Sequence, residues 1–199
     1  MIKIESDNIY FRLMVESDMP IISTAMTGVF DTGKIPNETD QKYFFYKANK
    51  QNSIFPKTPS TLKDGEKGYL NITICLKSTD APIGYYIIKY MGTRIENPIT
   101  ALIPEQRGRG LYSEIIVTKM RFSFDTLEAT EVMGILPTSD TWLRNAAVKH
   151  TVDSLYTHDE RIFSVDQGEY RQTTATKAEW DSWIASSPKK SLSYNLTWD

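Results

Sequence analysis

Cysteine, histidine and long apolar runs are all scarce in this sequence. Cys75 is the only cysteine, which excludes an intrachain disulfide and a multi-thiolate metal site and favours a reducing compartment, the cytoplasm. The two histidines, His150 and His158, belong to different predicted elements and show no triad pattern or metal-ligand spacing. No apolar run approaches the length of a membrane span, and the N-terminus lacks the regions of a secretion signal, so we expect no membrane partner.

The chain also lacks an excess of charge of either sign. Its 23 basic and 25 acidic side chains leave a formal net charge of −2, which gives no electrostatic reason to expect nucleic-acid binding and does not exclude it. With 199 residues, 40% of them hydrophobic, the chain can bury one substantial core. This size suits one soluble domain, or one domain with an insertion.

The stretch from Ile99 to Glu114 indicates a strand, a loop and the start of a helix. Gly108 and Gly110 allow positive φ and a close approach to the backbone, and the first amides of the helix have no partner within it. Free amides and the positive end of a helix dipole attract phosphate groups. A Walker loop is excluded because Leu111 and Tyr112 follow the second glycine, and a Gly-x-Gly-x-x-Gly loop fails at Ser113. The stretch therefore predicts a pyrophosphate cradle without a metal.

Hydrophobic periodicity predicts strands and helices along most of the chain. Strands are expected at 9–15, 69–76, 83–91, 99–103, 132–136, 162–165 and 170–174, and helices after Ser17, around 39–49, from Leu111, after Pro137 and from Thr176. Residues 30–68 otherwise form a long polar loop. Such a loop is either a surface insertion or a substrate lid.

The segment Arg107-Gly108-Arg109-Gly110-Leu111-Tyr112 resembles the coenzyme loop of the GNAT N-acetyltransferases, Gln/Arg-x-x-Gly-x-Gly/Ala, and departs from it at Tyr112. Residues 103–126, the turn at 168–171 and Glu179-Trp180 resemble the RimJ/RimL-type branch of that family. The resemblance implies one α/β (α+β) domain over residues 1–199, with 30–68 as a substrate-side insertion. Its sheet would be mixed, mostly antiparallel, flanked by helices, and split between the strands at 99–103 and 132–136.

The resemblance also implies acetyl-CoA as co-substrate, with no metal. The side chains of Arg107 and Arg109 would favour the phosphates, and Asn145 would contact the pantetheine arm. Asn145 lies deep in its helix, so Ser139 or Asp140 is the alternative. The complete set of expected coenzyme contacts is Leu102, Ile103, Arg107, Gly108, Arg109, Gly110, Leu111, Tyr112, Ser113 and Asn145.

In the implied reaction an amine attacks a thioester, which requires a base, a donor to the carbonyl oxygen and a proton for the thiolate. Glu96 and Glu105 are the candidate bases, and Glu105, close to Arg107 in a solvated loop, is better explained as structural. Backbone amides near Leu102 and Ile103 are the candidate donors. Tyr156 is the candidate proton donor, or else a core tyrosine.

The acceptor is the least determined part of this prediction. The RimJ/RimL-type resemblance implies a protein N-terminus, whereas the acidic and aromatic residues within 31–46 favour a cationic peptide or small amine. A homodimer is compatible with the resemblance. Tyr112, the displaced Asn145 and the lack of an obvious base leave an alternative open, a non-catalytic acyl-CoA-fold component of an assembly.

Overall fold

The computed structural model describes residues 2–26, 67–137, 158–165, 168–186 and 193–198. The strands are β1 (Ile2–Glu5), β2 (Ile9–Leu13), β3 (Lys67–Leu76), β4 (Pro82–Met91), β5 (Arg94–Leu102), β6 (Glu131–Pro137), β7 (His158–Val165), β8 (Gly168–Thr176) and β9 (Asn195–Trp198). The helices are α1 (Pro20–Met26), α3 (Leu111–Arg121) and α6 (Lys177–Ala185), with 3-10 turns η1 (Glu16–Asp18) and η3 (Pro104–Gln106) and a π-helical turn η4 (Phe122–Thr126).

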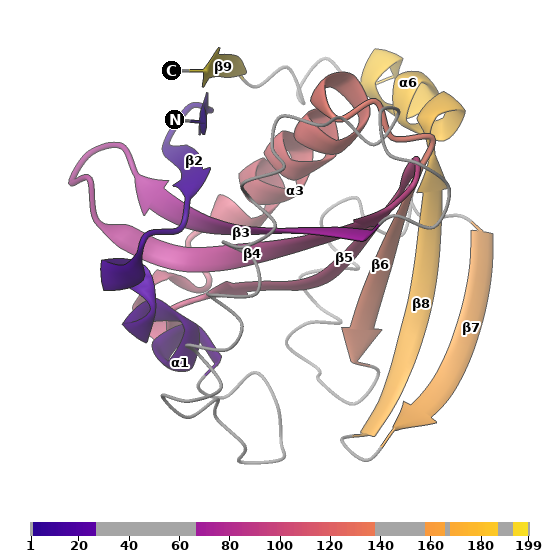
Figure 1. The fold of residues 1–199 in the computed structure, drawn as a ribbon, viewed down its shortest axis with the longest axis horizontal. Helices are drawn as coiled ribbons and strands as arrows, with labels where there is room; N and C mark the ends of the chain where they lie inside the picture. The colour runs from indigo at the N-terminus through magenta and orange to yellow at the C-terminus, as the bar shows by residue number, and fades with distance from the viewer. Residues whose placement is uncertain (1, 27–66, 138–157, 166–167, 187–192, 199) are drawn as a thin grey trace.

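The described strands form one sheet in the order β7-β8-β6-β5-β4-β3-β2-β1-β9 (Figure 1). Neighbouring strands are antiparallel except β5 and β6, which are parallel. This confirms the predicted mixed, mostly antiparallel sheet flanked by helices.

The predicted split in the sheet lies between β5 and β6. These strands pair only from Arg94↔Glu131 to Asn97↔Gly134. Beyond that point, residues 99–102 of β5 pair with β4 alone, and residues 135–137 of β6 pair with β8 alone. In these residues, the edge of β5 that faces β6 and the edge of β6 that faces β5 are therefore not paired with each other.

Helices cover both faces of the sheet (Figure 1). On one face, α3 and α6 pack on a large apolar cluster that includes Ile72, Tyr86 and Trp180. On the other face, α1 packs on a smaller cluster that includes Tyr85 and Ala101. Successive side chains of a strand point to opposite faces, which explains why Tyr85 and Tyr86 belong to different clusters.

Two predictions are wrong in detail, and two strands were missed. Ser17 is no N-cap, because a 3-10 turn with Val15 as its N-cap precedes α1. The strands β1 and β9, which pair with each other at one end of the sheet, were not predicted. Strand β5 begins at Arg94 rather than at residue 99.

The C-terminal predictions are confirmed and extended. Strands β7 and β8 pair as the expected hairpin, and both are longer than predicted. Thr176 caps α6 in the expected capping box, since its Oγ1 accepts from the Glu179 amide at 3.3 Å and its own amide donates to Glu179 Oε2 at 2.8 Å. The helices expected at 39–49 and after Pro137, and the loop up to residue 66, lie outside the described residues. No described helix has the length and apolar character needed to cross a membrane.

Candidate functional site

The loop after β5 leads into an open helix N-terminus. Gly108 and Gly110 have φ of 71° and 79°, in the left-handed region that favours glycine, and Gly110 is the N-cap of α3. A Cβ added at either glycine would meet nothing within 4 Å. In the described part of the chain, no side chain caps α3, so its first amides have no partner in the helix or in a side-chain cap. This geometry fits the predicted phosphate cradle.

The side chain of Arg107 lies elsewhere than expected. Its Nε donates to the carbonyl of Leu102 at 3.0 Å, and its Nη2 donates to the carbonyl of Ala25, at the end of α1, at 2.9 Å. Its amide donates to the carbonyl of Pro104 at 3.2 Å. Arg107 therefore ties the loop to β5 and α1, whereas Arg109 is exposed and remains the predicted phosphate cation.

Helix α3 is held in place by a buried carboxylate that the sequence analysis did not single out. Glu114 is 6% exposed, and its Oε1 accepts from the amides of Asn8 and Ile9 at 2.7 and 3.2 Å. Its Oε2 accepts from the Asn8 side chain at 3.0 Å. Because this carboxylate fixes the first turn of α3 to the loop between β1 and β2, the cradle is organised without a ligand.

The backbone of β5 presents a different pair of amides from the predicted one. The Ile103 amide donates to the carbonyl of Ile83 at 2.9 Å, so it is not available to a ligand. Hydrogen-bonding directions alternate along an antiparallel strand, and Gly84 lies opposite Leu102. The amides of Thr100 and Leu102 therefore point away from β4, to the open edge. Of the two predicted donors only Leu102 fits, and Thr100 was missed.

Glu96 lies where β5 and β6 begin to separate. It is opposite Met133, one residue before the last paired position of the two strands. Its Oε2 is 2.5 Å from Nζ of Lys89, and both side chains are partly exposed. The preceding residues, Ile88 and Ile95, pack in the α3-side cluster, so Lys89 and Glu96 point to the α1 face. Glu105 is exposed in η3.

The remaining predicted residues divide into half-buried and undescribed ones. Leu111, Tyr112 and Ser113 are half-buried in the first turn of α3. Burial raises the pKa of Tyr112 to about 12, so its phenol stays neutral at physiological pH. Asn145 and Tyr156, with the alternatives Ser139 and Asp140, lie outside the described residues, and their roles stay predictions.

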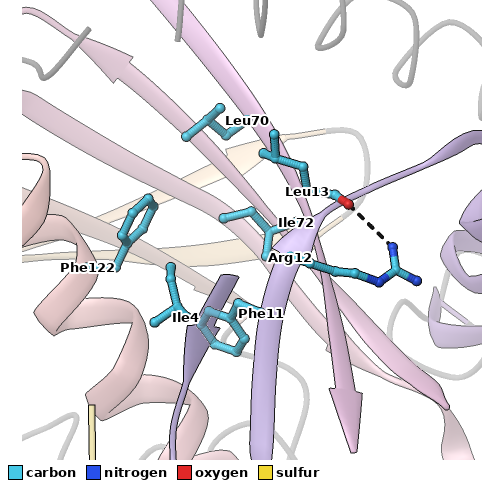
Figure 2. Close-up of a pocket in the computed structure, with 7 residues that line it drawn as sticks. All are labelled: Ile4, Phe11, Arg12, Leu13, Leu70, Ile72 and Phe122. Carbon is cyan, nitrogen blue, oxygen red and sulfur yellow. Dashed lines mark hydrogen bonds between the residues drawn. The ribbon is translucent and has the colours of Figure 1, made fainter. Parts of the chain in front are cut away.

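A pocket with no lining residue from this loop carries no ligand site. It lies among β1, β2, β3 and the turn after α3, and Figure 2 shows the residues that line it, Ile4, Phe11, Arg12, Leu13, Leu70, Ile72 and Phe122. The space inside is too small for a water molecule. The guanidinium of Arg12 points away from the apolar side chains and donates to the carbonyl of Leu13 at 3.3 Å (Figure 2). The pocket is a packing gap in the core.

Comparison with known proteins identifies the fold. No family model matches the sequence, and no curated protein does. Solved structures match over most of the chain. A GNAT-family acetyltransferase from Bacillus anthracis matches with a TM-score of 0.63 and 13% identity, over 88% of this chain and 99% of that one. A GCN5-related N-acetyltransferase from Brucella melitensis matches with a TM-score of 0.64 and 14% identity, over 94% of this chain and 86% of that one.

A third similar structure holds ligands. The spermidine N-acetyltransferase of Vibrio cholerae, in complex with CoA and spermine, matches with a TM-score of 0.62 and 11% identity, over 87% of this chain and 98% of that one. At these identities the likeness shows the fold alone. The chain has the GNAT fold, as predicted, and nothing in the comparisons separates the RimJ/RimL-type branch from the others.

Proposed function

We propose that the protein is an acyl-CoA-dependent N-acyltransferase that moves an acyl group, acetyl in the simplest case, to a primary amine. One observation carries the proposal: the paired edges of β5 and β6 separate just before a glycine loop, and the loop ends at a helix N-terminus that no described side chain caps. A long ligand with phosphates at one end and a reactive group at the other fits this arrangement.

The residues present fit the coenzyme. The amides from Gly108 to Ser113 would hold its phosphates, together with the exposed side chain of Arg109. The open edge of β5, with the amides of Thr100 and Leu102, would hold its extended arm. When bound, the coenzyme supplies an activated thioester carbonyl and a thiol leaving group. Asn145 remains a proposed contact to the arm.

Each step of the transfer has a candidate group in this chain. The amide of Thr100 or Leu102 would donate to the carbonyl oxygen as negative charge develops there. Glu96, at the base of the split, would take the proton of the attacking amine, directly or through a water. Tyr156 remains the proposed donor of a proton to the thiol.

The acceptor side is proposed to be the α1 face, where Glu96 points. The carboxylate of Glu96 would attract a cationic amine that takes the place of Lys89 beside it. The Vibrio structure binds spermine, which supports a small polyamine, and the RimJ/RimL-type resemblance supports a protein N-terminus. Residues 30–68 remain the proposed cover of this side, and cytoplasmic location and a homodimer remain proposals too.

A non-catalytic acyl-CoA-binding role is the second candidate function. The observation that favours it is the ion pair between Lys89 and Glu96, because the carboxylate that would accept the amine proton is already occupied by an ammonium group. A binding component of an assembly would keep the cradle and the open edge while lacking turnover.

Coenzyme binding tests the ligand proposal directly. Calorimetry should detect acetyl-CoA binding to the purified chain, and Gly110→Trp should abolish it by filling the cradle. The matched control is Gly92→Trp in the turn between β4 and β5, which also replaces a left-handed glycine facing open space. Binding that survives Gly110→Trp, or no binding at millimolar acetyl-CoA, contradicts the proposal.

Release of the CoA thiol then separates the two candidate functions. The protein is mixed with acetyl-CoA and a panel of polyamines, peptides with free N-termini and aminoglycosides. Thiol release with any acceptor supports the enzyme, and its loss in Glu96→Gln supports the assigned base. Tight coenzyme binding with no release across the panel favours the binding role.

A further inference from the structure

Lys119 is a buried lysine without a carboxylate partner in the described part of the chain. It is 5% exposed and lies on α3, facing the sheet. Its Nζ lies 3.3 Å from Oγ1 of Thr100 and 5.3 Å from the ring centroid of Tyr86. An ammonium has three N–H donors, and one hydroxyl and one ring face satisfy it only in part. A buried ammonium with no anion is costly to the folded chain.

The position of Lys119 relates it to the proposed coenzyme site. Thr100 lies on the open edge of β5, and its amide points toward β6. Nζ of Lys119 is one hydrogen bond from this half-buried threonine. Lys119 also follows Leu111, the first residue of α3, by eight positions, which corresponds to about 12 Å along the helix axis. A coenzyme whose phosphates lie at the glycine loop and whose arm runs along the open edge of β5 would thus bring its acyl end close to Lys119.

We propose that Lys119 binds a carboxylate on the acyl group, so that the preferred donor is a dicarboxylic acyl-CoA, such as succinyl-CoA, rather than acetyl-CoA. This inference rests on the proposed function and names its donor class. A carboxylate is the anion that the site requires, because the coenzyme phosphates bind at the other end of the ligand. An ion pair with Lys119 would replace the missing partner, and its charged hydrogen bond would add affinity that acetyl cannot supply.

The electrostatics of the site support the same reading. Burial lowers the pKa of Lys119 to about 8, and near neutral pH the ammonium form still predominates. A carboxylate brought next to this nitrogen favours the charged form. The ligand therefore satisfies a charge that the described part of the chain leaves without an anion.

The transfer itself leaves the carboxylate unchanged. The nitrogen of the acceptor amine bonds to the thioester carbonyl carbon, the carbon–sulfur bond breaks, and the amine proton passes to the CoA thiolate. The products are an amide that carries a free carboxylate and CoA thiol. No oxidant, reductant or further reactant is required.

Calorimetry with CoA, acetyl-CoA and succinyl-CoA tests the inference on the full chain. A charge-assisted hydrogen bond is worth about 1.5–3 kcal/mol, so succinyl-CoA should bind about tenfold or more tightly than acetyl-CoA. Lys119→Met, which keeps length and removes charge, should erase this difference and leave CoA affinity unchanged. Lys77→Met, at an exposed lysine in the β3–β4 turn, is the matched control and should keep the preference.

The outcomes distinguish this inference from the function on which it rests. Equal binding of the two thioesters by the wild type overturns the donor class and leaves the proposed function standing. A preference that persists in Lys119→Met overturns the assignment of the residue. No binding of any CoA species overturns both. The wild-type comparison needs no variant, and Lys119→Gln provides a second neutral variant if the methionine variant does not fold.

Discussion

Replacing Lys119 by methionine should make the ligand-free protein more stable at neutral pH. Most substitutions of buried residues destabilise a protein, so the sign of this prediction is distinctive. The reason is that Lys119 is 5% exposed and has no carboxylate partner among the described residues. Methionine fills similar space without a charge to desolvate.

The magnitude follows from the pKa of the amine. Burial lowers it from 10.5 to about 8. Each pKa unit corresponds to about 1.4 kcal/mol, so burying the ammonium costs the folded state about 3 kcal/mol below pH 8. The hydrogen bond to Thr100 and the contact with Tyr86 return about 1 kcal/mol of this. The expected gain in the free energy of unfolding is therefore about 2 kcal/mol.

The pH dependence has a definite sign. The folded pKa of Lys119 lies below the unfolded one, so between about pH 8 and 10.5 the unfolded chain binds more protons and wild-type stability rises with pH. The advantage of Lys119→Met should be full at pH 7 and shrink through this window. Urea unfolding followed by circular dichroism measures it, with Lys77→Met as the exposed control. A variant less stable than the wild type at pH 7, or a difference independent of pH, would refute the reasoning.

Three other substitutions test the supports of the site. Gly84→Ala would place its Cβ 2.3 Å from the carbonyl oxygen of Ala101. We therefore expect urea unfolding to show a loss of about 2 kcal/mol and calorimetry to show weaker coenzyme binding. An unchanged urea midpoint would contradict the close packing of β4 against β5 at this glycine. Arg107→Met removes the hydrogen bonds to the carbonyls of Leu102 and Ala25, so it should lower the free energy of unfolding by about 2 kcal/mol and weaken coenzyme binding about tenfold. Unaltered binding would contradict the positioning role of Arg107. Asp18→Asn should cost about 3 kcal/mol in urea unfolding at pH 7, because the buried Asp18 carboxylate is paired with Arg12. Burial raises the pKa of Asp18, but hydrogen bonds led by the one from Arg12 lower it below its usual value. The loss should therefore begin to shrink as pH falls below about 4 and vanish below the lowered pKa, and a loss that persists in strong acid would contradict the assignment.

The central strands were predictable because their signal is local. Alternating apolar residues in β3 and β4 reflect burial on a sheet face, and the sequence displays that pattern directly. Strands β1 and β9 also alternate, as Ile-Lys-Ile-Glu and Asn-Leu-Thr-Trp, but the pattern is too short to be a clear signal. Each has four residues, and they pair with each other from opposite ends of the chain. Only the folded chain brings these two strands together.

Strand β5 shows how a local rule can mislead. The sequence predicts a connection at Asn97-Pro98, before a strand that begins at residue 99. In the structure the strand runs through it, because the register shifts so that Asn97 and Pro98 together lie opposite Ile88. The shift falls at the position where β5 and β6 stop pairing. An irregular pairing therefore coincides with the opening of the candidate site.

The candidate site was predictable where backbone geometry dictates the residue type. Gly108 and Gly110 have the positive φ that the glycines indicated. The open amide of Thr100 was missed because the direction of an amide depends on pairing register, which a threonine in a strand does not reveal. Arg107 was assigned to phosphate from its neighbours in the loop, but its partner Ala25 lies 82 residues away.

The hydrogen bonds of Arg107 couple the two proposed ligand sides to each other. A single guanidinium joins the end of β5, the glycine loop and the end of α1. The loop is the proposed coenzyme side and α1 covers the proposed acceptor side, so a ligand that immobilises one also restrains the other. Thermodynamic linkage requires this effect to be equal in both directions. The two substrates are therefore expected to bind cooperatively, with steady-state kinetics of the sequential type.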